Sequence, residues 1–185
     1  IFSIIPFRDN LEITINCIKH FKNSNIEVNL KTVLVDNGSK DCQLLNKIKV
    51  ISDYYLYSKD EYNFSNLNNI GFSLIKKDLD LNKDYLLLLN NDCLISQDAL
   101  KNILSAINIS NSIAAAGGKL FYPNGKIQHG GVGITRKKPD YAPHKLYHID
   151  AHKDSQDSIA SKYPFFADGC TAACLLIRAN VYKKI

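Results

Sequence analysis

Three polar clusters in the first half of the sequence could bind an anionic ligand: PFR at 6–8, DNGS at 36–39 and NND at 90–92. Each cluster directly follows an apolar run typical of a β-strand. Ligands of open parallel sheets bind outside the carboxyl ends of the strands. We therefore expect one site, in which Arg8, Asp36 and Asp92 supply the charges. A lone aspartate after a strand often caps a turn, and that alternative stays open for both aspartates.

The chemistry expected of this site is the binding of a diphosphate together with a divalent metal ion. The sequence contains neither the dinucleotide fingerprint G-x-G-x-x-G nor the phosphate loop G-x-x-x-x-G-K-[ST]. Without a glycine-rich loop, a diphosphate needs another source of positive charge. Mg²⁺-like ions bind through one or two carboxylates together with substrate phosphates. Asp92, with Asn90 and Asn91 beside it at the end of an apolar strand, suits that task.

The elements that must position these clusters alternate between strand and helix patterns. Strand patterns cover residues 2–6, 31–36, 54–58 and 85–89, and helix patterns cover 10–23, 42–50, 69–77 and 97–107. Ser96 is expected to cap the last of these helices at its N-terminus. The alternating order predicts an α/β protein with a mostly parallel sheet and helices on both faces.

The second half of the chain has a different pattern. Residues 113–122, 123–126 and 127–134 read as strand, turn and strand, and 165–179 return to an apolar, strand-like run. The polar stretch from 135 to 163 has little periodicity and predicts a long loop, which in a compact domain is usually functional or mobile. His144, His148 and His152 are spaced by four, so a helix there could hold zinc, but Pro143 argues against a helix.

Composition excludes several classes of function. The net charge of +5 is compatible with an anionic ligand but too small to argue for nucleic acid. No apolar run approaches the ~20 residues of a membrane span. Five scattered cysteines favour reduced thiols and a cytoplasmic location, and we expect Cys170 and Cys174 to pack as small hydrophobic residues.

Six blocks, in order along nearly the whole chain, resemble the family-2 glycosyltransferases: SIIPFRDN, TVLVDNGSKD, EYNFSNLNNIGFS, LLLLNNDCLIS, GGKLFYPNGKIQHGGV and GCTAACLLIRANVY. The closest branch is that of bacterial rhamnosyltransferase-like enzymes that build surface polysaccharide. The resemblance implies the GT-A fold, with a nucleotide-binding, mostly parallel sheet and a smaller antiparallel acceptor-side portion. It also implies a nucleotide-diphosphate sugar donor, a glycan or lipid-linked glycan acceptor, and Mn²⁺ or Mg²⁺.

The donor-site residues follow from this resemblance. Asp36 matches the aspartate that contacts the nucleoside base, and Pro6 and Arg8 line the same pocket. Asp92 matches the last acid of the D-x-D motif, which holds the metal ion. Asn91 stands beside it as a nucleotide-binding candidate, at a position where other branches carry an acid.

Three further residues are carried over with open alternatives. Asn69 and Gly71 match a donor-pocket segment, although the asparagines there could equally belong to a capped helix start. His129 matches the sugar and acceptor side, with a surface histidine in a hairpin as the alternative. The resemblance places the catalytic base in an acidic pair beyond Ile185, and Asp168 is the candidate within this chain.

These observations favour an inverting, metal-dependent glycosyltransferase of hexosyl- or rhamnosyltransferase type. We expect one GT-A domain over 1–185, with a nucleotide-sugar half at 1–107 and an acceptor-side half at 108–185 that is incomplete at its C-terminus. Peripheral association with the inner face of the cell membrane stays open. The alternatives are a non-catalytic nucleotide- or carbohydrate-binding module and a sugar-nucleotide pyrophosphorylase, which would need a glycine-rich first loop where this chain has PFRDN.

Overall fold

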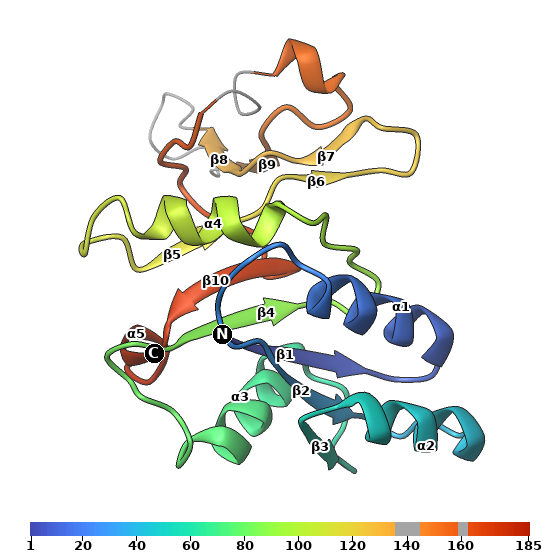
Figure 1. The fold of residues 1–185 in the computed structure, drawn as a ribbon. Helices are drawn as coiled ribbons and strands as arrows, with labels where there is room; N and C mark the ends of the chain where they lie inside the picture. The colour runs from blue at the N-terminus through green and yellow to red at the C-terminus, as the bar shows by residue number, and fades with distance from the viewer. Residues whose placement is uncertain (136–144, 159–162) are drawn as a thin grey trace. The chain divides into compact units, whose positions relative to one another are not determined.

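The computed structural model describes residues 1–135, 145–158 and 163–185. Its main feature is a six-stranded sheet with the order β3-β2-β1-β4-β10-β5 (Figure 1). The strands in chain order are β1 (Phe2–Phe7), β2 (Lys31–Asp36), β3 (Tyr54–Tyr57), β4 (Tyr85–Leu89), β5 (Ala115–Gly117) and β10 (Cys174–Arg178). Strands β1 to β4 are parallel, and β10 pairs with β4 in the antiparallel direction. The predicted mostly parallel sheet is confirmed.

Helices cover both faces of this sheet (Figure 1). They are α1 (Leu11–Lys22), α2 (Cys42–Ile51), α3 (Phe64–Ile75), α4 (Ala99–Ile107) and the short α5 (Ala179–Tyr182). Helices α1 and α2 contact each other, whereas α3 packs on β1 and β2. Right-handed crossovers explain the arrangement, because the chain moves outward from β1 to β3 and then returns past β1 to β4.

The alternation of side chains along the central strands divides the core between these faces. One set, which includes Ile4, Val33 and Val35, packs against Leu67 and Ile75 of α3. The residues that alternate with them in β1 and β2 are also buried. Nearly continuous apolar runs are expected of parallel strands that helices cover on both faces. Both faces of β1 and β2 are therefore covered.

Gly71 lets α3 approach the sheet closely. A Cβ atom at this position would lie 2.6 Å from Ile4 Cγ2 and 3.2 Å from Val35 Cγ2. The buried residues of the helix are Leu67, Asn68, Gly71 and Ile75, and Leu67, Gly71 and Ile75 are spaced by four residues along one face. A side chain at Gly71 would push the helix away from the strands.

Two expected helix starts are wrong. Helix α3 begins at Phe64 rather than near residue 69, because the Asn63 side chain accepts a hydrogen bond from the Asn66 N–H at 2.9 Å and caps it. Helix α4 begins at Ala99 with Asp98 at the N-cap position. Ser96 does not cap it; its carbonyl oxygen accepts from the Ala99 N–H in a preceding turn.

The chain divides into two compact units, Ile1–Ala116 with Ala172–Ile185, and Gly117–Thr171. These bounds differ from the halves expected at 1–107 and 108–185, since the last residues return to the sheet as β10 and α5. The second unit contains β6 (Leu120–Phe121), β7 (Ile127–His129), β8 (Val132–Thr135), β9 (Lys145–His148) and a 3₁₀ turn (Ser155–Asp157). Its pairs β6-β7 and β8-β9 are both antiparallel.

The long loop predicted from 135 to 163 is wrong where the structure describes it. Strand β9 pairs with β8 inside that stretch, and all four of its residues are exposed, so they show no burial alternation that the sequence could reveal. Residues 136–144 and 159–162, and with them His144, lie outside the described part. Because His148 lies in a strand, the helical zinc arrangement does not form, and the described residues contain no metal-binding group of three.

Candidate functional site

The sheet has a topological switch point between β1 and β4. From β1 the chain proceeds to β2 and β3 on one side, and β4 then lies on the other side of β1. In open α/β sheets, ligands bind in the crevice outside the carboxyl ends of the strands at such a point. Arg8 follows β1 directly, and the NND cluster follows β4 directly. The structure thus brings two of the three predicted clusters to the two sides of the switch point.

Arg8 and Asp92 are both exposed at this edge. In the part of the chain that the structure describes, neither side chain has a hydrogen bond or an ion pair. Opposite charges without partners on the two sides of a switch point are suited to a ligand that carries phosphate and a cation. Arg8 and Asp92 therefore lie after neighbouring strands at this edge of the sheet, and their role in binding stays a prediction.

The two asparagines before Asp92 hold the turn in place. The Asn90 N–H donates to the Ala173 carbonyl oxygen at 3.0 Å, which ties the turn to the chain entering β10. The Asn91 Nδ2 donates to Thr14 Oγ1 on α1 at 3.0 Å. The amide donor of Asn91, expected at the nucleotide, is thus engaged in fixing the turn.

Asp36 ends β2 and is fully buried. Its Oδ1 accepts from the Ser39 N–H at 2.9 Å, and its Oδ2 accepts from the Tyr55 hydroxyl at 2.8 Å. Burial and this hydrogen bond to Asp36 raise the pKa of Tyr55. The Asp36 carboxylate therefore holds the DNGS turn and joins it to the neighbouring strand β3. This is the turn-capping role that the sequence left open as an alternative to the expected contact with the base.

Asn37 is a residue that the sequence reasoning did not single out. It is 5% exposed, its N–H donates to the Phe7 carbonyl oxygen at 2.8 Å, and its Nδ2 donates to the Asp60 carbonyl oxygen at 2.9 Å. Its Oδ1 is buried without a partner in the described residues. An unsatisfied buried acceptor costs about 1–3 kcal/mol, so it marks a position where a ligand or water donor is expected. In the sequence, Asn37 could have been found as a candidate because it directly follows the aspartate that ends β2.

The loop after β1 is hydrogen-bonded to the loop after β2. The Asp9 N–H donates to Ser39 Oγ at 2.8 Å, and the Lys40 N–H donates to Asp9 Oδ1 at 3.2 Å. Asp9 and Asn10 both have left-handed backbones, with φ of 52° and 47°. Asparagine and aspartate tolerate this conformation better than other non-glycine residues. These contacts fix the backbone that follows Arg8.

Three predicted donor-site residues lie elsewhere. Pro6 is inside β1, opposite Val35 of β2, and is buried. Gly71 faces the strands from α3, as described above. Asn69 is exposed on α3, and its Oδ1 accepts from the Tyr182 hydroxyl of α5 at 2.9 Å. The structure does not bring Asn69 and Gly71 to the switch point, because they lie beyond the first turn of a helix that starts at Phe64.

In the second unit, Asp168 is exposed and its Oδ2 accepts from the Ile134 N–H of β8 at 2.8 Å. His129 is 2% exposed, so it is not the surface histidine considered as an alternative. Its Nε2 accepts from the Thr171 N–H at 3.3 Å, and its Nδ1 lies 2.7 Å from His148 Nδ1. Burial and the nearby His148 lower the pKa of His129. His129 is therefore a neutral ring whose Nδ1–H donates to His148.

The donor set at the switch point fits a divalent ion that is held partly by its substrate. The described residues contain no group of three histidine, cysteine or acidic side chains that could hold a metal ion. Asp92 provides one exposed carboxylate. Mg²⁺ usually binds through one or two carboxylates together with substrate phosphates, so one carboxylate is sufficient when a diphosphate is present.

No family model matches the chain. It is 26% identical over 193 residues to the uncharacterized protein y4gI of Sinorhizobium fredii, covering 98% of this chain and 20% of that protein. The chain therefore spans about a fifth of that relative.

Three solved glycosyltransferase structures are similar at low sequence identity. The mannosyltransferase PcManGT of Pyrobaculum calidifontis, in complex with GDP-Man and Mn²⁺, has a TM-score of 0.47 at 13% identity, covering 62% of this chain and 33% of that one. Residues 1–349 of S. aureus TarS in complex with UDP give 0.42 at 18%, covering 58% and 32%. The galactosyltransferase LgtC, with donor and acceptor sugar analogues, gives 0.44 at 12%, covering 100% and 60%. These scores do not establish a shared family.

Proposed function

We propose that this chain carries the donor-binding region of a metal-dependent glycosyltransferase with a GT-A fold. It transfers a hexose or rhamnose, with inversion, from a nucleotide-diphosphate sugar to a glycan or lipid-linked glycan in bacterial surface polysaccharide synthesis. The observation that carries this proposal is the switch point between β1 and β4, where Arg8 and Asp92 are exposed without partners in the described residues. The resemblance to the family-2 enzymes supplies the reaction and the acceptor class.

The diphosphate is bound at the two sides of the switch point. The Arg8 guanidinium offers two parallel N–H donors to phosphate oxygens. Asp92 would hold Mn²⁺ or Mg²⁺, and such an ion would supply positive charge to offset that of the leaving diphosphate. Asn90 and Asn91 keep the Asp92 turn fixed against the chain entering β10 and against α1. The charges are thus in place before the donor arrives.

The nucleoside is bound beside the DNGS turn. The unpaired Asn37 Oδ1 accepts an N–H from the base or a hydroxyl from the ribose. Asp36 and Tyr55 form the supporting wall of this position, because their hydrogen bond joins the ends of β2 and β3. Uracil, guanine, cytosine and adenine all carry an N–H donor, so Asn37 alone does not select the base.

The acceptor side belongs to the second unit in this proposal. His129, fixed by the Thr171 N–H and by His148, contacts the sugar or acceptor as a neutral ring. A general base must come within hydrogen-bond reach of the acceptor hydroxyl. Asp168 is the candidate in this chain for that role.

A non-catalytic nucleotide-binding module is the second candidate. One observation favours it: Asp168, the candidate base, already accepts a backbone N–H that holds β8. The pyrophosphorylase alternative is weaker, since the loop after β1 carries no glycine. We further propose a cytoplasmic location, in keeping with the five free cysteines, and peripheral association with the membrane. Among the described residues, no helix is long and apolar enough to cross a membrane.

The test is calorimetric titration of the chain with uridine, guanosine, thymidine, cytidine and adenosine diphosphates, each with and without Mn²⁺. We expect at least one to bind with an affinity that Mn²⁺ increases, and Asn37→Ala to weaken that binding with or without the metal. Asn46→Ala, an exposed asparagine on α2, is the matched control and should bind normally. The proposal fails if no diphosphate binds at millimolar concentration. Donor turnover with and without Asp168→Asn separates the enzyme from the binding module.

A further inference from the structure

Three cysteines converge beside the turn that carries Asp92. Cys174 is the first residue of β10 and pairs with Leu89, the last residue of β4. The turn that follows β4 is closed by the Cys93 N–H, which donates to the Asn90 carbonyl oxygen at 3.1 Å. The same oxygen accepts from Cys17 Sγ of α1 at 3.4 Å.

The backbone fixes Cys93 and Cys174 on either side of one junction. The Asn90 N–H donates to the Ala173 carbonyl oxygen at 3.0 Å, so the start of the turn and the start of β10 are hydrogen-bonded. Across that junction, the Cys174 side chain hydrogen-bonds to the Cys93 side chain. The two sulfur atoms are therefore neighbours although they lie far apart in the sequence.

The three thiols differ in reactivity. Cys93 is half-buried, so a small reagent can reach it, whereas Cys174 is 4% and Cys17 is 0% exposed. Burial, with Cys93 and Asp92 nearby, raises the pKa of Cys17 to about 12, which leaves it unreactive at neutral pH. Cys93 is thus the thiol of the pair that a reagent reaches first, and the buried Cys174 is its resolving partner.

We propose that Cys93 and Cys174 form a reversible disulfide, a redox modification site beside the Asp92 turn. The oxidant is a low-molecular-weight disulfide such as oxidised glutathione. The Cys93 thiolate attacks one sulfur of the oxidant, forms a mixed disulfide and releases one thiolate. The Cys174 sulfur then attacks Cys93 Sγ, loses its proton to solvent and expels the second thiolate. The two cysteines lose two electrons and two protons, and the oxidant becomes two thiols.

The bond has a consequence for the metal site, and this step rests on the proposed function. A disulfide holds its sulfur atoms about 2.05 Å apart, much closer than two hydrogen-bonded thiols. Forming it draws Cys93 toward β10 and shifts Asp92, the preceding residue. Metal–ligand distances in a well-formed site lie within about 0.2 Å of their usual values, so a shift of Asp92 lowers the Mn²⁺-dependent part of nucleoside-diphosphate affinity in the oxidised chain. Reduction restores it.

The experiment incubates the whole chain in glutathione buffers from fully reduced to fully oxidised, blocks free thiols, and maps peptides by mass spectrometry without reduction. We expect a Cys93–Cys174 cross-link that appears with oxidation and disappears with reduction. Cys42→Ser and Cys170→Ser, which remove exposed thiols, are the controls and should keep it. Cys93→Ser should abolish it. Cys174→Ser should abolish it as well, and Cys174→Ala takes its place if the serine variant fails to fold.

The outcomes are separable. Glutathione adducts on Cys42 and Cys170, with Cys93 and Cys174 both unmodified, would overturn the proposal, as would a Cys17–Cys93 cross-link. The second measurement is uridine or guanosine diphosphate affinity with Mn²⁺ in the reduced and oxidised chain. A cross-link that forms while the reduced chain binds no nucleotide supports the modification site and removes the proposed function. A cross-link that leaves a measured metal-dependent affinity unchanged removes the regulatory step.

Discussion

Two pairs of charged residues, one pair at each end of the parallel strands, differ in whether the fold itself supplies their partners. At the end where β2 and β4 begin, Asp53 and Arg178 are surrounded by partners. At the end where β1 and β4 finish, Arg8 and Asp92 are exposed and have no partner among the described residues. A charge that the fold itself neutralises stabilises the fold, and a charge left without a partner is available to a ligand.

Asp53 shows the first case. Its carboxylate forms ion pairs with Lys22 and, at 3.1 Å, with Lys31, and it accepts from the Thr32 N–H and hydroxyl at 2.9 and 3.0 Å. Burial alone would raise the pKa of Asp53, but these hydrogen bonds outweigh it and lower the pKa to about 2. The carboxylate joins the end of α1 to the starts of β2 and β3.

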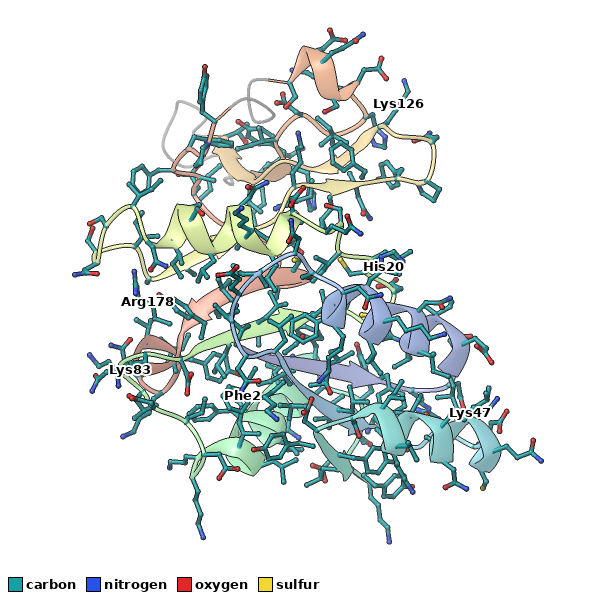
Figure 2. All side chains as sticks on the ribbon, in the orientation of Figure 1. Phe2, His20, Lys47, Lys83, Lys126 and Arg178 are labelled. Carbon is teal, nitrogen blue, oxygen red and sulfur yellow. The ribbon has the colours of Figure 1, made fainter. Side chains whose placement is uncertain are left out.

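Arg178 is the basic counterpart at the same end (Figure 2). Its guanidinium donates to the carbonyl oxygens of Ile113 at 2.9 Å and Ile107 at 2.8 Å, and to the Tyr85 hydroxyl at 3.2 Å. These bonds fasten the end of β10 to α4 and to the chain that follows it. Among the residues that the structure describes, Arg8 makes no such contacts, although it has the same side chain.

The largest effect that we expect concerns Asp92, one of the two exposed charges, and it is an effect on nucleotide affinity. Asp92→Asn should remove the Mn²⁺-dependent part of nucleoside-diphosphate binding, a loss of roughly 100-fold or about 2.8 kcal/mol, because in the proposed site the metal loses the one carboxylate that the described residues offer it. Asp92→Asn should leave the free energy of unfolding unchanged. Calorimetric titration and denaturant unfolding measure the two quantities.

Asp53→Asn is the matched control, since it makes the same chemical change at the other end of the sheet. It should lower stability and leave the metal-dependent affinity intact. The contrast would collapse if Asp53→Asn weakened nucleotide binding in the folded protein as much as Asp92→Asn.

The next effect is on stability and compares the two arginines. Arg178→Gln should lower the free energy of unfolding by about 2 kcal/mol, since the glutamine cannot reach all the carbonyl oxygens that the guanidinium satisfies. Arg8→Gln should change it by less than about 0.5 kcal/mol, the usual range for an exposed residue. Urea unfolding of both variants decides the matter. Equal losses would show that Arg8 has structural partners after all.

A smaller loss is expected from Gly71→Ala. The added methyl group would meet Ile4 Cγ2 at 2.6 Å, so helix or strand must shift, at a cost of about 1–2 kcal/mol. Because Gly71 packs on the strands and not at the switch point, nucleoside-diphosphate affinity should be unchanged once the variant is folded. Thermal unfolding and titration together test this, with Ser73→Ala on the exposed face of α3 as the control. Lost affinity in a folded Gly71→Ala protein would return Gly71 to the donor pocket.

The sequence was sufficient to predict the parallel sheet and the place of two charges. Regular apolar runs predict β1, β2 and β4, and the residues after them must lie at the same edge, so Arg8 and Asp92 could be located without a structure. The positions of Asn69 and Gly71 could not be predicted in this way. The start of α3 depends on a side-chain cap at Asn63, and the place of Gly71 depends on close packing against Ile4. The capped helix start, one of the alternatives open from the sequence, is the arrangement observed.

Other features depend on contacts between distant segments. That Asn37 has a buried acceptor without a partner follows from how β1, β2 and the chain near Asp60 meet. The neighbouring thiols of Cys93 and Cys174 arise because β10 enters the sheet beside β4 in the antiparallel direction, which an alternating β-α pattern does not reveal. Cys174 is buried, as expected, but Cys170 is exposed and does not pack in the core.

The smallest effect concerns acid stability at the satisfied end. The folded pKa of Asp53, about 2, lies below the unfolded value of about 3.9, so its ionised form stabilises the protein above pH 4 and that contribution is lost as the pH falls toward 2. Since the carboxylate is partly exposed, solvent screening limits this contribution to about 1 kcal/mol or less. Urea unfolding between pH 5 and about 2.5 should therefore show a shallower acid decline in Asp53→Asn than in the parent. Glu27→Gln, at an exposed carboxylate with no ion pair in the described residues, is the control and should keep the parent slope more closely. An unchanged slope in Asp53→Asn would mean that its ion pairs contribute nothing, and the charges at the two ends of the sheet would then differ in geometry but not in energy.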